Sequence, residues 1–188
     1  MQTLARSSTT RQRSPAADFI LAVLIGLTAA LAKRYLDFHL GVPGHAGVGW
    51  VAVLVSGRLL NRRTGMATVA GLAMGLWGGP VGLGHSIGHN VLLYGLAGSL
   101  LDSDTLVRLP MRRVWGAAVA GIVVHLAKFG FVFANAWISG ILRRVEVFGF
   151  LRAFANHLVF GAAGGVLGWA IWRGGGKLRA RLNRRLTS

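Results

Sequence analysis

The sequence lacks cysteine altogether and has very few acidic side chains. Its 188 residues include only five Asp and Glu and four Pro, and only 14% of them are charged. The absence of Cys excludes disulfide bonds and thiolate chemistry. So little charge is unusual for a soluble domain of this length. Three of these acids fall in predicted loops between apolar runs: Asp102, Asp104 and Glu146.

What the chain does contain is apolar residues and glycine. Hydrophobic residues make up 53% of the sequence, and there are 28 Gly, most of which lie inside the apolar runs. Small residues inside such runs are typical of transmembrane helices that approach one another closely. The composition therefore predicts an all-α, polytopic membrane protein, a helical bundle of the cell inner (plasma) membrane.

The basic residues are numerous and unevenly placed. There are 21 Lys and Arg, which give a formal net charge of +16. Many of them flank the apolar core, before residue 17 and after residue 172. Basic ends of this kind favour a cytoplasmic location beside anionic lipid. We expect the lipid bilayer, and not nucleic acid, to be their partner.

Six apolar runs define the predicted organisation, at residues 18–36, 47–60, 66–77, 84–101, 114–133 and 150–172. We expect a disordered basic tail at 1–16, a six-helix transmembrane domain at 17–173 and a basic cytoplasmic tail at 174–188. An even number of crossings that begins inside places both termini in the cytoplasm. The run at 47–60 is short for a full crossing, which takes roughly 20 residues.

Polar residues within the runs concentrate on one side of the predicted membrane. With a rise of about 1.5 Å per residue, His125 lies roughly 16 Å from the inner surface. By the same calculation, the other polar side chains within the runs lie closer to the outer surface than His125 does. Ionisable groups in hydrocarbon usually face a protein interior or a watery cavity. We therefore predict an outward-facing pocket lined by His85, His89, Asn90, His125, Lys128, Asn156 and His157. The alternative is that each of these groups only makes a hydrogen bond between helices.

The histidines also permit a metal hypothesis, since imidazole binds zinc, nickel and cobalt. No carboxylate lies near them in sequence, and the Lys128 ammonium would repel a cation. Lys128 instead favours a ligand with an anionic group or a ring-nitrogen acceptor. Aromatic residues that are candidates to stack on such a ring are Trp50, Trp77, Tyr94, Phe129, Phe133 and Trp137.

Several longer motifs resemble the substrate-binding S components of energy-coupling factor (ECF) vitamin transporters. The likeness covers residues 18–172. It includes a small-residue stripe (Ala22, Gly26 and Ala30), the loop GVPGHAG, the turn NRRTGMATVAGL and the segment WGGPVGLGHSIGHNVLLYGLAGSL. The last segment is most similar to the hydroxymethylpyrimidine or thiamine branch.

This resemblance implies a subunit that captures a small vitamin-like molecule from outside. It implies that His45 belongs to a loop that closes over the pocket. It also implies that Ala22, Gly26 and Ala30 dock on a transmembrane coupling subunit driven by ATPase subunits. The stripe is equally compatible with packing inside this chain.

We therefore predict the specificity subunit of a micronutrient importer. No nucleophile motif and no P-loop occurs, so we expect neither enzymatic activity nor ATP hydrolysis by this chain, and we predict no cofactor. Two alternatives stay open, a nickel, cobalt or zinc importer subunit and a membrane interaction or assembly protein.

Overall fold

The computed structural model describes residues 14–36, 42–140 and 147–186, and the regular structure in these ranges is entirely helical. The seven helices are α1 (Pro15–Tyr35), α2 (Gly47–Leu60), α3 (Met66–Gly78), α4 (Ile87–Asp102), α5 (Asp104–Val107), α6 (Val114–Ile138) and α7 (Val147–Leu186). Six of them occupy the six predicted apolar runs. The short α5 falls in a segment that the sequence predicts as a loop.

Three helices are long and apolar enough to cross a membrane. They are α1, α6 and the segment Gly149–Ala180 of α7, whereas α2 and α3 are shorter apolar helices. A span of the hydrocarbon core takes roughly 20 residues, which α2 and α3 do not reach. The fold thus defines the chain as a candidate all-helical, multi-pass membrane protein.

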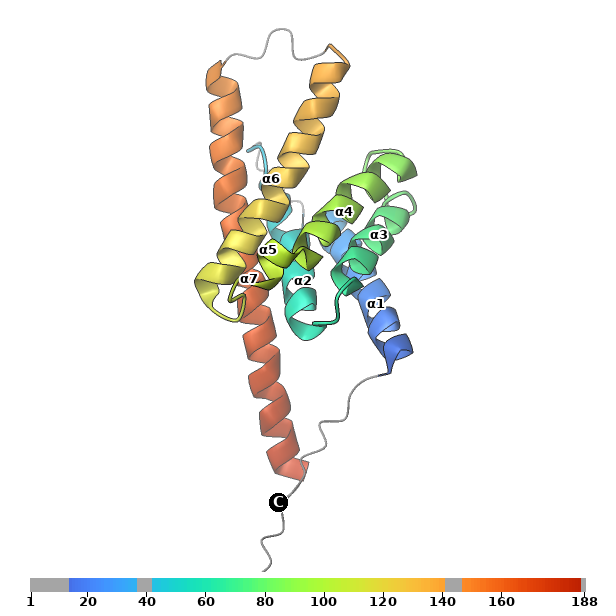
Figure 1. Ribbon diagram of the computed structural model, residues 1–188, viewed down its shortest axis with the longest axis vertical. Coiled ribbons are helices and arrows are strands. Elements are labelled where there is room, and N and C mark those ends of the chain that lie inside the picture. The colour runs from blue at the N-terminus through green and yellow to red at the C-terminus, as the bar shows by residue number, and fades with distance from the viewer. Residues whose placement is uncertain (1–13, 37–41, 141–146, 187–188) are drawn as a thin grey trace, which may run out of the picture.

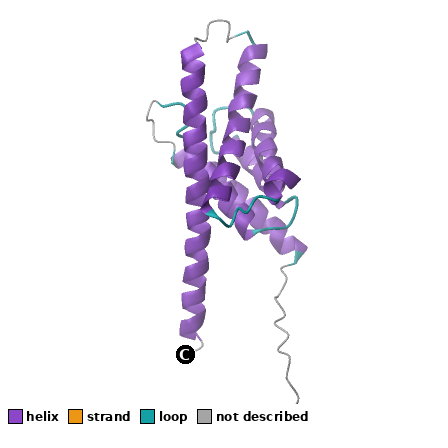
Figure 2. Cartoon of the chain, turned by 60° about the vertical axis from the view of Figure 1, so that its left-hand side comes forward, coloured by secondary structure: helices purple, strands orange, loops and turns teal. Residues whose placement is uncertain are grey.

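The two ends of the chain differ from expectation. Residues 1–13 of the predicted disordered tail lie outside the described residues, but the tail's last two residues begin α1, where Ala17 N donates to the Ser14 side chain at 3.2 Å. At the other end, α7 does not stop near residue 172. It continues through three consecutive glycines as one helix of 40 residues and extends past the other helices (Figures 1 and 2).

The helices pack as pairs, with α3 against α4 and α6 against α7 (Figure 1). In both pairs, the helices cross at a glycine that lies against the backbone of the facing helix. A Cβ at Gly71 would overlap the carbonyl oxygen of Tyr94, and a Cβ at Gly121 would overlap that of Gly161. Helices in a membrane gain little from apolar burial alone, so such close approach is a main source of their association.

The small-residue stripe of α1 packs against α3 of the same chain. Ala22 and Ala30 have at most 1% of their surface exposed, and a Cβ at Gly26 would overlap the carbonyl oxygen of Ala70. The predicted docking role for Ala22, Gly26 and Ala30 is therefore corrected. Packing within the chain already covers these three residues, so they present no free surface to a coupling subunit.

A polar network ties together the helix ends near residues 58–68 and 102. The Asp102 carboxylate accepts hydrogen bonds from Thr68 N at 2.8 Å and from Thr68 Oγ1 at 2.9 Å, and it pairs with Arg58 Nε at 3.4 Å. Arg58 also donates to the carbonyl oxygen of Leu101 at 3.2 Å. The side chain of Asn61 reaches α1, where it donates to the carbonyl oxygen of Asp18. One carboxylate thus joins α2, α3 and α4.

The glycine crossings generate a stability prediction. Gly121→Ala forces α6 and α7 apart, because the added methyl group overlaps the Gly161 carbonyl, and we expect a loss of about 1–3 kcal/mol. Gly130→Ala is the matched control, since it lies on the same helix with nothing within 4 Å of an added Cβ. It should be neutral or slightly stabilising. Thermal unfolding of the two variants in detergent compares them, and equal effects would contradict the packing role.

Candidate binding site

The start of α4 places one pair of histidines. Ser86 is the N-cap and its hydroxyl accepts a hydrogen bond from His89 N at 3.3 Å, so the helix begins at Ile87. His85 consequently precedes the helix, although the predicted apolar run of residues 84–101 includes it. The two rings nevertheless stack, with centroids 4.5 Å apart. His89 also meets the Phe131 ring of α6 edge-on at 5.0 Å.

A second pair of histidines joins α6 to α7. The His125 ring stacks on the His157 ring at a centroid distance of 4.6 Å, and His125 Nδ1 lies 3.0 Å from the carbonyl oxygen of His157. His157 Nδ1 lies 2.7 Å from the carbonyl oxygen of Ala153, and its ring contacts Phe129. Imidazoles from both helices therefore share one seam.

The described part of the first loop covers this seam. Gly44 adopts a φ of +92°, and a Cβ there would lie 3.1 Å from His157 Nδ1. A Cβ at Gly47 would overlap His125 Nε2, so only glycine fits at the start of α2. His45 meets the Phe160 ring edge-on at 6.5 Å. Residues 42–47 thus lie directly against the histidine pair, while residues 37–41 of the predicted lid lie outside the described residues.

Lys128 lies on α6, close to the Trp50 ring of α2. Its Nζ lies 5.7 Å from the centroid of the Trp50 ring, and Trp50 in turn meets the rings of Tyr94 and His125 edge-on. An ammonium over an aromatic face is a stabilising cation–π arrangement. The seam therefore combines one cation with aromatic rings from three helices. We call this group the histidine cluster, and it comprises His45, Trp50, His85, His89, Tyr94, His125, Lys128, Phe129 and His157.

Several buried polar atoms in and beside the histidine cluster have no hydrogen-bond partner. Among the described residues, these atoms are Trp50 Nε1, His89 Nε2, Asn90 Oδ1, His125 Nε2 and Asn156 Nδ2. Most buried polar atoms in native proteins are hydrogen-bonded, because an unsatisfied one costs about 1–3 kcal/mol. Atoms of this kind need partners in the folded protein, which ordered water or a bound ligand can supply.

Two predicted pocket residues behave differently from the others. Asn90 is fully buried, but its amide nitrogen donates to the carbonyl oxygen of His85 at 3.2 Å and packs against Gly78 of α3. It therefore fixes the loop before α4 and leaves only its oxygen unsatisfied. Asn156 is partly buried on α7, next to His157.

The predicted aromatic residues divide into two groups. Trp50, Tyr94 and Phe129 belong to the histidine cluster, and Phe133 contacts Phe129 and Phe150 just beyond it. Trp77 and Trp137 are 42% and 68% exposed and stand outside it. Exposed tryptophans of this kind are typical of membrane-interface anchors.

Two cavities of ≈390 Å³ and ≈610 Å³ lie away from the histidine cluster, the larger between α1, α2 and α7. Within the region of the histidine cluster, His125 and Asn90 have no exposed surface, whereas His85 is exposed and Lys128 and His157 are partly buried. Gly44 and Gly47 allow the described part of the first loop to pack directly on the imidazoles. The outward opening stays a prediction from the sequence.

Sequence reasoning missed Gly44, Gly47 and Phe131 as neighbours of the histidines. The glycine-rich pattern GVPGHAGVG was the available signal for close backbone approach, but it does not say which side chain approaches. Within the described ranges, no three His, Asp or Glu side chains come together as a set of metal ligands. The imidazoles are arranged as two stacked pairs.

Comparisons with protein-family models, curated proteins and solved structures found no match to this chain. The resemblance to S components therefore stays a prediction from the sequence.

The loop position of His85 generates a prediction about pH. Burial, and then the neighbouring His89 and Lys128, lower the pKa of His85. Because the folded state favours the neutral ring, this contribution to stability is present above about pH 6.5 and is lost as the pH falls. Proton NMR titration of the His85 ring should show its pKa rising in Lys128→Met, whereas Lys177→Met, an exposed change on α7, should leave it unaltered. An unchanged pKa in Lys128→Met would contradict the proximity of Lys128 to this histidine pair.

Proposed function

We propose that this chain is the membrane-embedded substrate-binding subunit of a micronutrient importer, with the histidine cluster as its binding site. The observation that supports this function is the set of five buried polar atoms without partners, which come from α2, α4, α6 and α7. Residues that only join helices are expected to find most of their partners in one another, so the concentration of these atoms around one seam favours a ligand. A ligand with matching polar groups would satisfy these atoms when it binds.

The chemistry of the histidine cluster indicates the class of ligand. The Trp50 indole and the Asn156 amide offer N–H donors, the Asn90 oxygen is an acceptor, and the imidazoles can serve as either. Aromatic rings and the Lys128 ammonium surround them. Such a site suits a small flat ring that carries nitrogen acceptors or an anionic group, as vitamin-like molecules do.

The proposed topology has six crossings with both termini in the cytoplasm. The long α1, α6 and α7 support full crossings, and α2, α3 and α4 would cross as thinner, tilted elements inside the bundle. The histidine cluster then lies in the outer half. In the closed arrangement, a ligand from outside reaches the imidazoles when residues 42–47 move away from His157 and His125.

Energy for import would come from other chains. We propose separate ATPase subunits and a transmembrane coupling subunit, in keeping with the resemblance to S components. The coupling subunit would contact a surface other than the Ala22, Gly26 and Ala30 stripe, because α3 covers that stripe. The exposed apolar side chains of α1, which include Phe19, Ile20 and Leu24, lie on its other side.

Mass spectrometry of small molecules that co-purify with the detergent-solubilised protein tests this function. We expect a stoichiometric small molecule with the wild-type chain and at least about a tenfold loss in Lys128→Met and in His157→Gln, since each removes a charged or polar contact worth more than about 1.4 kcal/mol. The matched control is Lys177→Met, which makes the same chemical change on an exposed part of α7 and should retain the molecule.

Thermal unfolding separates binding from structure. If no molecule co-purifies with any variant, and the substitutions only lower the unfolding temperature, then the polar residues merely join helices. The interaction or assembly protein would then be the better account. Nickel, cobalt or zinc retained by the wild type and lost from His157→Gln would instead indicate metal import.

A further inference from the structure

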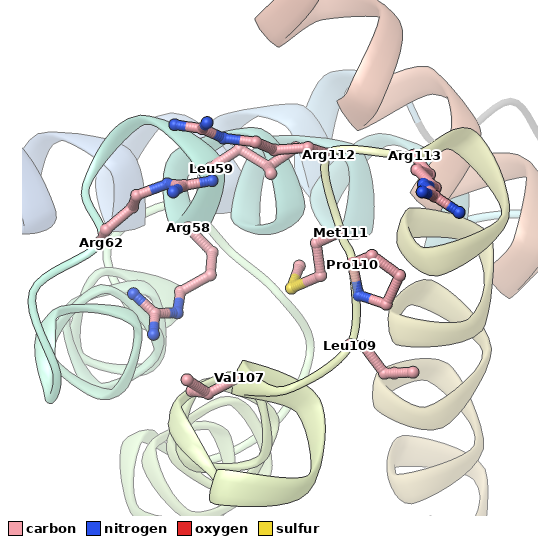
Figure 3. Close-up of a pocket in the computed structure, with 9 residues that line it drawn as sticks. All are labelled: Arg58, Leu59, Arg62, Val107, Leu109, Pro110, Met111, Arg112 and Arg113. Carbon is pink, nitrogen blue, oxygen red and sulfur yellow. The ribbon is translucent and has the colours of Figure 1, made fainter.

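A second polar site lies at the end of the bundle where α2 ends and α6 begins. The cavity there has a volume of ≈390 Å³ and is lined by residues of α2, of the following turn and of the segment 107–113. Figure 3 shows the guanidinium groups of Arg62 and Arg112 near one another, with Arg58 and Arg113 on opposite sides of Met111 and Pro110. No carboxylate is among the residues that line it.

The four arginines are not equivalent. Arg58 is buried, and Asp102 together with the carbonyl oxygens of Leu101 and Asn61 already occupies its guanidinium. The other three are exposed on the cavity rim and have no carboxylate partner within the described parts of the chain. Burial, and then the charges of Arg112 and Arg58, lower the pKa of Arg62. The cavity therefore carries an uncompensated positive charge.

The backbone around the cavity is held in place by specific contacts. Trp169 of α7 donates its indole N–H to the carbonyl oxygen of Arg112 at 2.7 Å. Close packing of Gly116 against the carbonyl oxygen of Pro110 fixes the turn into α6, whose first turn begins just after Arg113. The positive end of the α6 dipole adds to the charge at this point. The arginine backbones are thus positioned before any ligand arrives.

We propose that this cavity binds a phosphate-bearing anion. Guanidinium groups form bidentate, charge-assisted hydrogen bonds with phosphate oxygens, which a lysine cluster does not match in geometry. The volume falls within the range of ligand sites and exceeds what a bare ion needs. Leu59, Leu109 and Met111 line the remainder and suit the organic part of a phosphate ester.

The phosphate has two sources, the headgroup of an anionic phospholipid and a soluble phosphate compound. In the proposed topology this end of the bundle lies at the cytoplasmic membrane surface, where anionic lipid is abundant. The cavity is separate from the histidine cluster, because His125 lies about 18 Å along α6 from Arg113. The inference therefore does not depend on the proposed transport function.

Binding experiments on the purified full-length chain in detergent distinguish the sources. One arm titrates inorganic phosphate against the protein by calorimetry at constant ionic strength. The other adds short-chain phosphatidylglycerol, or phosphatidylcholine with the same chains, and counts bound lipid by native mass spectrometry. The test variant is Arg62→Gln with Arg112→Gln. The matched control is Lys177→Gln with Arg179→Gln, which removes the same charge from the exposed face of α7.

We expect saturable binding to the wild type and to the control, with an affinity at least about tenfold lower in the test variant because two charge-assisted contacts are lost. Binding in the phosphate arm assigns a soluble phosphate compound. Binding of phosphatidylglycerol alone assigns the lipid headgroup. An absence of saturable binding in both arms, or an equal loss in the test variant and the control, would overturn the proposal. Thermal unfolding of both double variants verifies that they are folded.

Discussion

The close contact between glycine and backbone carbonyl groups is the constraint on which the rest of this structure depends. The α6–α7 crossing is made by Gly121, Gly161 and Gly165, each placed so that a Cβ would overlap or crowd the facing helix. His125 lies one turn from Gly121, and the Cβ of His125 is 3.0 Å from where a Cβ of Gly161 would stand. The stacked imidazoles are therefore a consequence of the distance between two backbones. A wider crossing would separate His125 from His157 and open the seam to lipid.

The polar groups near Asp102 and those of the histidine cluster differ in how many hydrogen-bond partners they have. Near Asp102, the carboxylate accepts two hydrogen bonds from Thr68 through Oδ2 and pairs with Arg58 through Oδ1, which makes no hydrogen bond of its own. In and beside the histidine cluster, the Trp50 indole and His125 Nε2 are buried without partners. More of the buried atoms without a hydrogen-bond partner lie in and beside the histidine cluster than near Asp102, where Oδ1 is one of them. The stability cost of such atoms is therefore larger around the imidazoles.

Sequence reasoning predicted much of the fold and part of the site. Apolar runs located six of the helices, because their lengths and flanking charges are read directly from the chain. It misplaced the start of α4, where the N-cap Ser86 shifts the first turn past His85, and it ended α7 too early, since tertiary context overrides the low helix propensity of three glycines. The convergence of His125, Lys128 and His157 was predicted from depth along the helices. The depth of a residue along a helix does not determine which way the helix is rotated about its axis. The packing of Gly47 on His125 and the burial of Gly26 by α3 could therefore not be predicted from depth.

The glycine triplet of α7 has a mechanical consequence. Gly174, Gly175 and Gly176 each weaken the helix by about 1 kcal/mol relative to alanine, and a Cβ at any of them would meet nothing within 4 Å. The last glycine of α7 that abuts α2 is Gly168, so the triplet lies just past the region of tight interhelical packing. Bending there is cheaper than bending anywhere nearer the imidazoles. We therefore expect any bend in α7 to fall at the triplet, which would leave the contact of His157 with α6 unchanged.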